Sequence, residues 1–214
     1  QVEVDGTQLE VVDSFCYLGD MLNGGGRCEC TIVNRCCTAW GKSRKLLPIL
    51  TSKHPSLMAH GKVFNAYVRS TMLHGSETWA PSAPDLQRIR RNDRAMVRWI
   101  YGVKVHDDVH SDALHAMLGI QEVTEALYTR RLRWYGHVMR SSSCTNTVMG
   151  LNISGLRGRG RPRKTWLNSV KADKRTCSLD DVDSLNKLAW RSGVRKSSHL
   201  LPTPITGNPA AVEI

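Results

Sequence analysis

The sequence predicts a mainly α-helical protein with a small β element at its N-terminus. Alternation of apolar and polar residues is confined to residues 2–18. From about residue 28 onward, apolar residues recur at helical spacing, in segments bounded by capping residues, glycines and prolines. Three prolines fall in the last twenty residues, so we expect a disordered C-terminal tail.

The N-terminal residues are expected to form short strands. Val2–Val12 alternates around Asp5-Gly6, a dipeptide that suits a primed two-residue turn, and so predicts a β-hairpin. A third short strand is expected at Phe15–Leu18. Three short strands bury little surface, so they need other elements to pack against. After a glycine-rich break, the spacing predicts a helix over Glu29–Leu47 that Pro48 ends.

The next predicted helix covers about residues 55–73. Its apolar side is expected to contain Leu57, Phe64, Tyr67, Val68 and Thr71. Lys62 and Arg69 fall on the opposite side. The pattern therefore predicts a core helix with a basic back.

A capping box predicts the start of a further helix. Ser82 and Asp85 have the required spacing, and Gly102 can close the helix after about residue 101. Its apolar stripe is Leu86, Ile89, Met96, Val97 and Ile100. The other side carries four candidate phosphate-binding residues, Arg88, Arg91, Arg94 and Arg98. Asp93 falls on the apolar side and is expected either to be paired, with Arg90 as a candidate, or to lie at its edge.

Two helices are predicted next, a short one that Ser111 caps and a longer one over about 124–140. The longer helix has a broad apolar arc, and its remaining strip is Arg130, Arg133, His137 and Arg140. The three arginines of this strip are further candidate nucleic-acid-binding residues. Arg131 projects from the apolar arc, so it is expected to be paired or to extend to solvent. His137 has no acid or nucleophile near it in sequence and is interpreted as structural.

The last predicted helices follow a Ser, Asn, Gly and Thr-rich linker over residues 141–156. A short helix is expected over 166–174. Ser178 and Asp181 have capping-box spacing and predict a helix to about residue 191, whose apolar side holds Leu179, Val182, Leu185 and Leu188.

The strongest chemical signal is the basic stretch Arg157–Trp166, which carries five positive charges and no negative one. Glycines keep the backbone thin, so several guanidinium groups can lie along one groove. Its core resembles the AT-hook, which inserts into the minor groove of A·T-rich DNA. A basic linker that touches phosphates without sequence preference is the alternative. The candidate residues are Arg157, Arg159, Gly160, Arg161, Pro162, Arg163 and Lys164.

The net charge of +11 indicates a polyanionic partner. The charge is concentrated in the middle, with −5 over residues 1–34, +9 over 35–140, +7 over 141–175 and 0 over 176–214. With no apolar run long enough to span a bilayer and no signal peptide, we expect an intracellular, nuclear protein without a membrane partner. A chain that starts at Gln1 is also expected to be a piece of a longer protein.

Neither a metal site nor a catalytic site is expected. The spacing of Cys28, Cys30, Cys36 and Cys37 does not fit a structural zinc site, so buried thiols are the favoured reading. Two carboxylate pairs, Asp107-Asp108 and Asp180-Asp181, lie where helices begin rather than on strands that could hold two metal ions.

Five stretches occur in the order found downstream of the polymerase centre in LINE-type non-LTR retrotransposon reverse transcriptases, and the chain resembles that family. They are Phe15–Gly19, residues 67–79 (Tyr67 to HGSETW), 92–103 (NDRAMVRWIYGV), 130–140 (RRLRWYGHVMR) and 158–166 (GRGRPRKTW). The resemblance covers residues 1 to about 191. Its departures, Asp20, His74 and Asn92, indicate divergence from the family pattern.

The resemblance implies a role for each region. Residues 1–27 would be the end of the palm with its primer grip, in which Phe15, Tyr17, Leu18 and Gly19 hold the growing 3′ end. Residues 28–140 would be the helical thumb and following helices, 141–165 a basic linker, 166–192 a short helical segment and 193–214 the tail. The family's catalytic Asp pair would lie before Gln1, so the chain would not be an enzyme by itself, and Mg²⁺ would belong to the absent palm.

The resemblance therefore implies a nucleic-acid-binding fragment of an RNA-directed DNA polymerase. Its partners would be RNA, an RNA–DNA hybrid or duplex DNA, together with the missing palm and fingers. No cofactor is expected in the chain itself. The alternatives are a stand-alone AT-hook-like DNA-binding protein and a transposon-derived relic without function.

Overall fold

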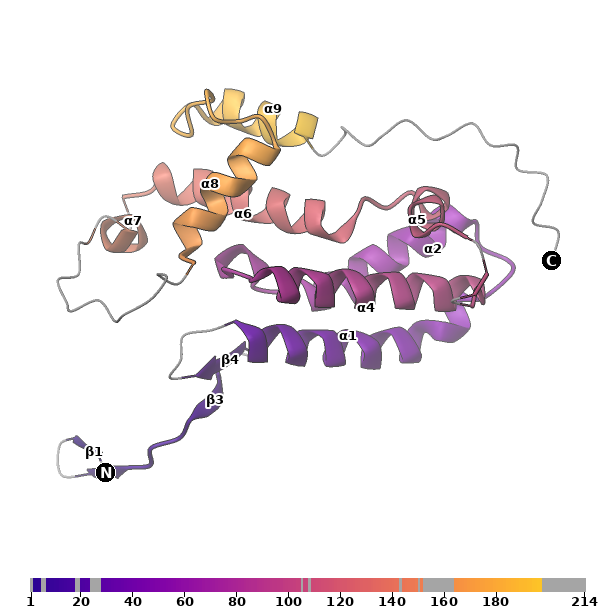
Figure 1. The fold of residues 1–214 in the computed structure, drawn as a ribbon, viewed down its shortest axis with the longest axis horizontal. Helices are drawn as coiled ribbons and strands as arrows, with labels where there is room; N and C mark the ends of the chain where they lie inside the picture. The colour runs from indigo at the N-terminus through magenta and orange to yellow at the C-terminus, as the bar shows by residue number, and fades with distance from the viewer. Residues whose placement is uncertain are drawn as a thin grey trace.

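The computed structural model describes residues 2–4, 7–17, 20–23, 28–104, 106–107, 109–142, 144–149, 151 and 164–197 of the 214. This part is mainly helical with small antiparallel sheets at the N-terminus, which confirms the predicted fold class (Figure 1). The strands are β1 (Val2–Val4), β2 (Thr7–Leu9), β3 (Ser14–Tyr17) and β4 (Asp20–Asn23). The helices are α1 (Glu29–Leu50), α2 (Leu57–Val63), π-helix η1 (Phe64–Arg69), α3 (Ser70–Met72), 3-10 helix η2 (Ser76–Thr78), α4 (Ala83–Tyr101), α5 (Ser111–Leu118), α6 (Val123–Met139), α7 (Cys144–Met149), α8 (Trp166–Thr176) and α9 (Lys187–Ser197).

The strands form two hairpins. β1 pairs with β2 as predicted, although β2 ends at Leu9 rather than at Val12. β3 pairs with β4, a strand that the sequence did not predict because its end coincides with a glycine-rich break. Thr31 Oγ1 on α1 donates to the Met21 carbonyl (2.8 Å), so the second hairpin is attached to the helices.

α1 continues through Pro48, and the prediction that this proline ends the helix is wrong. A proline removes one N–H donor and crowds the carbonyl four residues earlier. Pro48 lies in the last turn, where little helix remains to be disrupted. Thr51 N then donates to the Leu47 carbonyl (2.9 Å) and closes the helix at Leu50.

The helix predicted over 55–73 is present as α2, η1 and α3, with Ser56 as N-cap, but its faces differ from the prediction. A π-helical turn holds more residues than an α-helical turn, so the side chains within it point in directions that differ from the α-helical pattern. Arg69, predicted on a basic outer side, is therefore 1% exposed, and Tyr67, predicted in the core, is 56% exposed.

The predicted boundaries of α4 and the predicted end of α5 before Gly119 are confirmed. Ser82 and Asp85 form the capping box of α4, and Gly102 (φ 67°) closes it. Gly119 (φ 63°) ends α5, whose N-cap is His110 rather than Ser111. Left-handed φ values of this kind favour glycine.

The C-terminal part differs from the prediction in two places. α7 lies inside the segment predicted as a linker. Ser178 does not cap a helix but has a left-handed φ of 52° after α8, and Leu179 N bonds back to the Lys174 carbonyl (2.8 Å). The last described helix is α9, which extends to Ser197, so the tail predicted from residue 193 begins helically. Residues 198–214 lie outside the described part.

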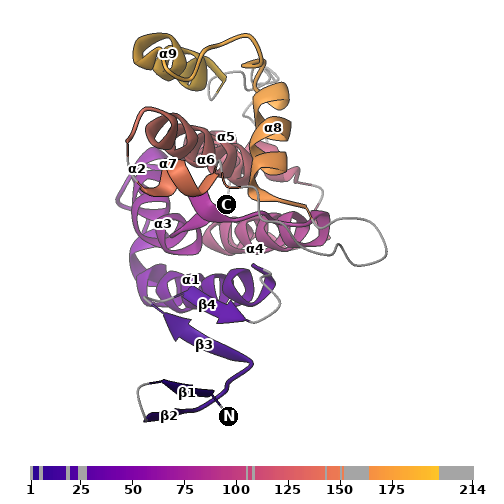
Figure 2. The ribbon, with the colours of Figure 1, turned by 90° about the vertical axis from the view of Figure 1, so that its left-hand side faces the viewer.

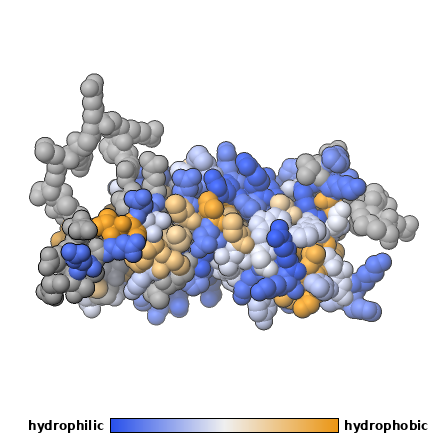
Figure 3. All heavy atoms as spheres, turned by 90° about the horizontal axis from the view of Figure 1, so that it is seen from below, coloured by the Kyte–Doolittle hydropathy of each residue, from blue (hydrophilic) through white to orange (hydrophobic). Residues whose placement is uncertain are grey.

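The helices form a stack in the order α1, α4, α6 and α9 (Figures 1 and 2). One apolar cluster joins α1 to the N-terminal half of α6, and a second joins α6 to α8 and α9. Figure 3 shows the face on the α1 side, where apolar areas are separated by hydrophilic ones. α6 therefore contributes to both cores.

Candidate nucleic-acid interface

α9 is held against α6 by a buried tryptophan. Trp190 is 1% exposed, and its Nε1 donates to the Leu132 carbonyl (3.0 Å). Gly136 makes this close approach possible, because a Cβ there would lie 2.4 Å from Trp190 Nε1. Two helices that approach so closely bring the side chains beside the contact onto facing walls.

α8 is fixed to α6 by a buried ion pair. Arg131 Nη1 donates to Asp173 Oδ2 (2.6 Å), and both side chains are almost fully buried. Burial raises the pKa of Asp173 to about 6, and the positive charge of Arg131 opposes that rise. Arg131 was expected to be either paired or extended to solvent, and the structure confirms that it is paired.

A groove of about 810 Å³ lies between the C-terminal half of α6 and α9. We call it the α6–α9 groove. Its lining is Arg133, His137, Arg140, Ser141, Ser142, Lys187, Trp190, Arg191, Val194 and Arg195. These residues include five lysines and arginines and no carboxylate.

The cations form two facing rows. Lys187, Arg191 and Arg195 are spaced by four residues and share one side of α9, while Arg133 and Arg140 lie on α6. Like charges at this spacing destabilise a helix by about 0.2–0.5 kcal/mol per pair. A groove with cationic walls produces a positive potential that an anionic ligand relieves.

Two contacts shape the edge of the groove. Arg140 Nη1 donates to the Ser184 carbonyl, which holds the segment before α9 against α6. His137 packs against Trp134, with ring centroids 5.5 Å apart and planes inclined by 35°. His137 is exposed and lines the groove, so the pair that it forms with Trp134 borders the groove.

The groove contains Arg133 and Arg140 of the predicted binding residues. Arg130 does not line it, and its Nη1 donates instead to the Leu73 carbonyl (2.9 Å). The sequence does not predict Lys187, Arg191 and Arg195 as binding residues, because its pattern ends the helix at about residue 191 with Leu185 and Leu188 on the apolar side. Those two leucines are 60% and 81% exposed. A stripe of basic residues at spacing four around Trp190 is the signal that could have found α9.

The arginines of α4 are partly engaged within the protein. Arg88 approaches Glu29 and Arg94 approaches Asp112, each at 3.8 Å, while Arg98 donates to the carbonyls of Lys104 and Val109. Exposed pairs at such distances contribute little. Arg88 and Arg91 line a second groove of about 520 Å³ between α1 and α4, which also contains Trp40 and Asn92.

Arg157–Arg163 of the basic stretch lies outside the described residues. Lys164 is the first described residue after this gap, and its Nζ donates to the Pro81 carbonyl (3.3 Å). Trp166 Nε1 donates to the Glu77 carbonyl (2.7 Å). The end of the stretch is thus attached to the turn before α4.

Of the primer-grip-like residues, Phe15 and Tyr17 lie on β3 with exposed side chains and ring centroids 6.2 Å apart. Leu18 and Gly19 lie outside the described part. Asp20, on β4, accepts from Arg35 Nη2 (2.7 Å) and Nε (3.1 Å), so the hairpin that carries these aromatic residues is tied to α1.

The residues that depart from the LINE-type pattern all make specific contacts. Arg35 Nη2 lies 3.2 Å from His74 Nδ1 as well as bonding Asp20. Asn92 Oδ1 accepts from Trp40 Nε1 (2.8 Å). Two of the three departures therefore meet at one arginine, and the third joins α4 to α1.

Among the described residues, no three His, Cys, Asp or Glu side chains lie close enough to hold a metal ion together. Cys36 is buried, and burial raises the pKa of its thiol to about 11. Cys30 and Cys37 are exposed, so the prediction of buried thiols holds for Cys36 and not for these two. Asp108 lies outside the described part, and Asp180 and Asp181 lie in the loop before α9 rather than at a helix start.

A distant relative is found among known proteins. A Caenorhabditis elegans protein described as uncharacterized and transposon-derived is 24% identical over 184 residues, which cover 81% of this chain. The chain spans 64% of the length of that relative. No protein-family model matches the chain, and no solved structure matches it. No described helix is long and apolar enough to cross a membrane. The chain is thus distantly related to a transposon-derived protein.

Proposed function

We propose that this chain binds nucleic acid as the primer-grip, thumb and post-thumb part of a LINE-type reverse transcriptase. The observation that carries the proposal is the α6–α9 groove, whose lining contains five cations and no carboxylate. A lining of this composition suits the phosphodiester backbone, to which most protein–nucleic-acid hydrogen bonds are made. The distant transposon-derived relative and the five ordered motifs support the assignment to a retroelement.

In this proposal the chain holds the template and primer, and another part of the polymerase carries out the chemistry. The family resemblance supports this division, because the catalytic aspartates and their Mg²⁺ belong to the palm in that family. The palm and fingers would be the protein partners. Phe15 and Tyr17 would face the primer from the exposed side of β3.

A salt titration tests the binding. The probe is an RNA template annealed to a shorter DNA primer, so that it offers both an RNA–DNA hybrid and an unpaired template strand. The affinity of the chain for this probe is measured by fluorescence anisotropy over a range of salt concentrations. Each phosphate contact contributes roughly 0.7–0.9 to the slope of log K against log salt. The variant Arg133→Gln/Lys187→Gln/Arg191→Gln removes three exposed cations of the groove and should therefore lower the slope by about 2–3.

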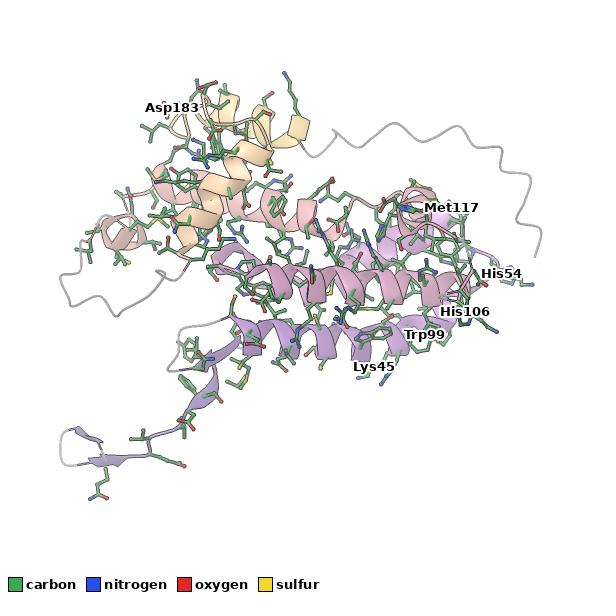
Figure 4. The ribbon with its side chains drawn as sticks, in the orientation of Figure 1. Lys45, His54, Trp99, His106, Met117 and Asp183 are labelled. Carbon is green, nitrogen blue, oxygen red and sulfur yellow. The ribbon has the colours of Figure 1, made fainter. Side chains whose placement is uncertain are left out.

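A matched control lies on α1. Lys42→Gln/Arg44→Gln/Lys45→Gln removes the same charge from exposed positions, and Lys45 lies on the α1 side of the molecule while Asp183 marks the α9 side (Figure 4). The control should keep the wild-type slope. Equal slopes for the wild type and both variants would contradict the proposal, and so would equal losses in both variants.

The basic stretch offers a second arm of the same test. Replacing Arg159, Arg161 and Arg163 with alanine should also flatten the salt dependence, because these guanidinium groups are expected to contact phosphates. Stronger binding to A·T-rich than to G·C-rich duplex DNA, lost in this variant alone, would instead favour the AT-hook-like alternative.

A further inference from the structure

The α6–α9 groove has dimensions that suit one strand of nucleic acid. Its volume of about 810 Å³ lies within the range of about 300–1,000 Å³ that is typical of small-molecule pockets. A few nucleotides of an unpaired strand can enter a space of this size, whereas a duplex, with two backbones around stacked base pairs, cannot.

The cations occupy both walls rather than one surface. Lys187 and Arg195 are eight residues apart on α9, a span of about 12 Å, and Arg133 and Arg140 cover a similar length of α6. Cations on two facing walls can contact a single backbone from both sides. A duplex that rests on the outside would contact the rim of either wall but not the interior.

The aromatic pair beside the groove gives a second reason. Trp134 and His137 lie one helical turn apart on α6 with their rings 5.5 Å apart, and His137 also lines the groove. Aromatic side chains next to a cationic groove bind unpaired strands by stacking on the exposed faces of bases. In a duplex those faces are covered by neighbouring base pairs, so the pair would have nothing to stack on.

We infer that the α6–α9 groove binds an unpaired strand of RNA or DNA, with cations from both walls on its phosphates and Trp134 and His137 stacking on a base. This inference rests on the proposed function and specifies its ligand. It separates two tasks within the chain. Duplex would be held by other surfaces, and the α6–α9 groove would hold a strand that has not yet paired or has been displaced.

The test compares single strands with the duplexes they form. Labelled probes of about 16 nucleotides, the upper end of site sizes for single-strand binding folds, are made as RNA, as DNA and as the corresponding duplexes. At about 0.1 M salt, loss of three phosphate contacts at roughly 0.7 each predicts about 100-fold weaker binding of the single strands by Arg133→Gln/Lys187→Gln/Arg191→Gln. Duplex binding should change several-fold at most, and the α1 control triple variant should resemble the wild type with every probe.

Substitutions at Trp134 test base stacking separately from charge, because they leave every cation of the groove in place. Trp134→Leu removes the ring and should weaken single-strand binding by about 5- to 150-fold, the range for loss of one stacked base. Trp134→Phe keeps a ring and should restore most of the affinity. Binding of heparin, a polyanion without bases, should be the same for both variants. Unfolding curves in urea establish that each variant is folded before its binding is compared.

The possible outcomes separate the inference from the proposed function. If the groove variant loses single strands and duplexes equally, or if Trp134→Leu binds single strands like the wild type, the inference is wrong and the proposed function stands. If the wild-type chain binds none of the probes, the proposed function fails as well. A selective loss of RNA or of DNA identifies which unpaired strand the groove holds.

Discussion

The buried charge cluster at Asp93 leads to a strong prediction about stability. Asp93 is 0% exposed and accepts from Arg69 Nε (3.0 Å) and Nη2 (2.7 Å) and lies 2.9 Å from His115 Nε2. Arg69 and His115 are themselves 1% and 3% exposed. Asp93→Ala would leave a guanidinium group and an imidazole buried beside a cavity. Breaking a buried pair in this way costs about 3–5 kcal/mol, which is a large part of a total stability of about 5–15 kcal/mol.

Urea unfolding followed by tryptophan fluorescence measures this loss, and for a chain of this length the midpoint of thermal unfolding should fall by about 6–20 °C. Asp181→Ala removes an exposed aspartate and serves as a control, with an expected change within about 0.5 kcal/mol. The double variant Arg69→Met/Asp93→Leu should recover much of the loss, because apolar side chains need no charge partner. A loss below about 1 kcal/mol for Asp93→Ala would refute the reasoning.

The same cluster predicts a pH dependence. Burial alone would raise the pKa of Asp93, but the charge of Arg69 and the hydrogen bonds from His115 and Arg69 outweigh it and hold the pKa below its usual value. A carboxyl group with a lowered pKa contributes stability above its unfolded pKa of about 3.9, and that contribution is lost as the pH falls through the folded value. Acidification below about pH 4 should therefore destabilise the wild type more than Asp93→Ala.

Three further predictions concern the other helices. Gly136→Ala should lower the free energy of unfolding, because overpacking against Trp190 costs about 2 kcal/mol. This cost exceeds the gain of roughly 1 kcal/mol in helix propensity. Urea unfolding measures the change, and a variant more stable than the wild type would contradict the close contact at Gly136. Burial raises the pKa of Asp173 to about 6, although the positive charge of Arg131 acts to lower it. The stability that protonated Asp173 contributes near pH 4 is therefore lost as the pH rises through 6. The difference in unfolding free energy between the wild type and Asp173→Asn should accordingly fall by about 3 kcal/mol from pH 4 to pH 7, and a constant difference would oppose it. Ser82→Ala removes the N-cap of α4 and should cost about 1 kcal/mol, whereas Ser82→Asp should cost little.

Elements whose ends are fixed by local chemistry could be predicted from the sequence. The capping box at Ser82 and the glycines that end α4 and α5 depend on backbone groups within a few residues, so their signals are complete in the sequence. The same holds for the apolar stripe of α4, where Ile89 and Val97 are buried as expected.

Features that depend on distant partners could not be predicted. The π-helical turn η1 rotates Arg69 into the core, where Asp93 lies 24 residues away in sequence. The predicted partner Arg90 instead approaches Glu122 (3.2 Å). The α6–α9 groove likewise exists because Trp190 packs at Gly136, a contact between segments that share no local signal. The sequence therefore predicts the α6 wall of the groove as a basic strip on one helix, but it does not predict the α9 wall.

The contacts of the divergent residues bear on the alternative that the chain is a relic. Asp20 and His74 both meet Arg35, and Asn92 accepts from the Trp40 indole. Arg35 is 8% exposed, so an unconstrained substitution at Asp20 or His74 would leave a buried guanidinium group short of a partner, at about 1–3 kcal/mol. Because total stability is only about 5–15 kcal/mol, a few unpaired groups would be enough to unfold the chain. Divergence in which the new residues find partners preserves the contacts of β4 and α4 with α1, and it indicates constraint on the fold rather than free drift.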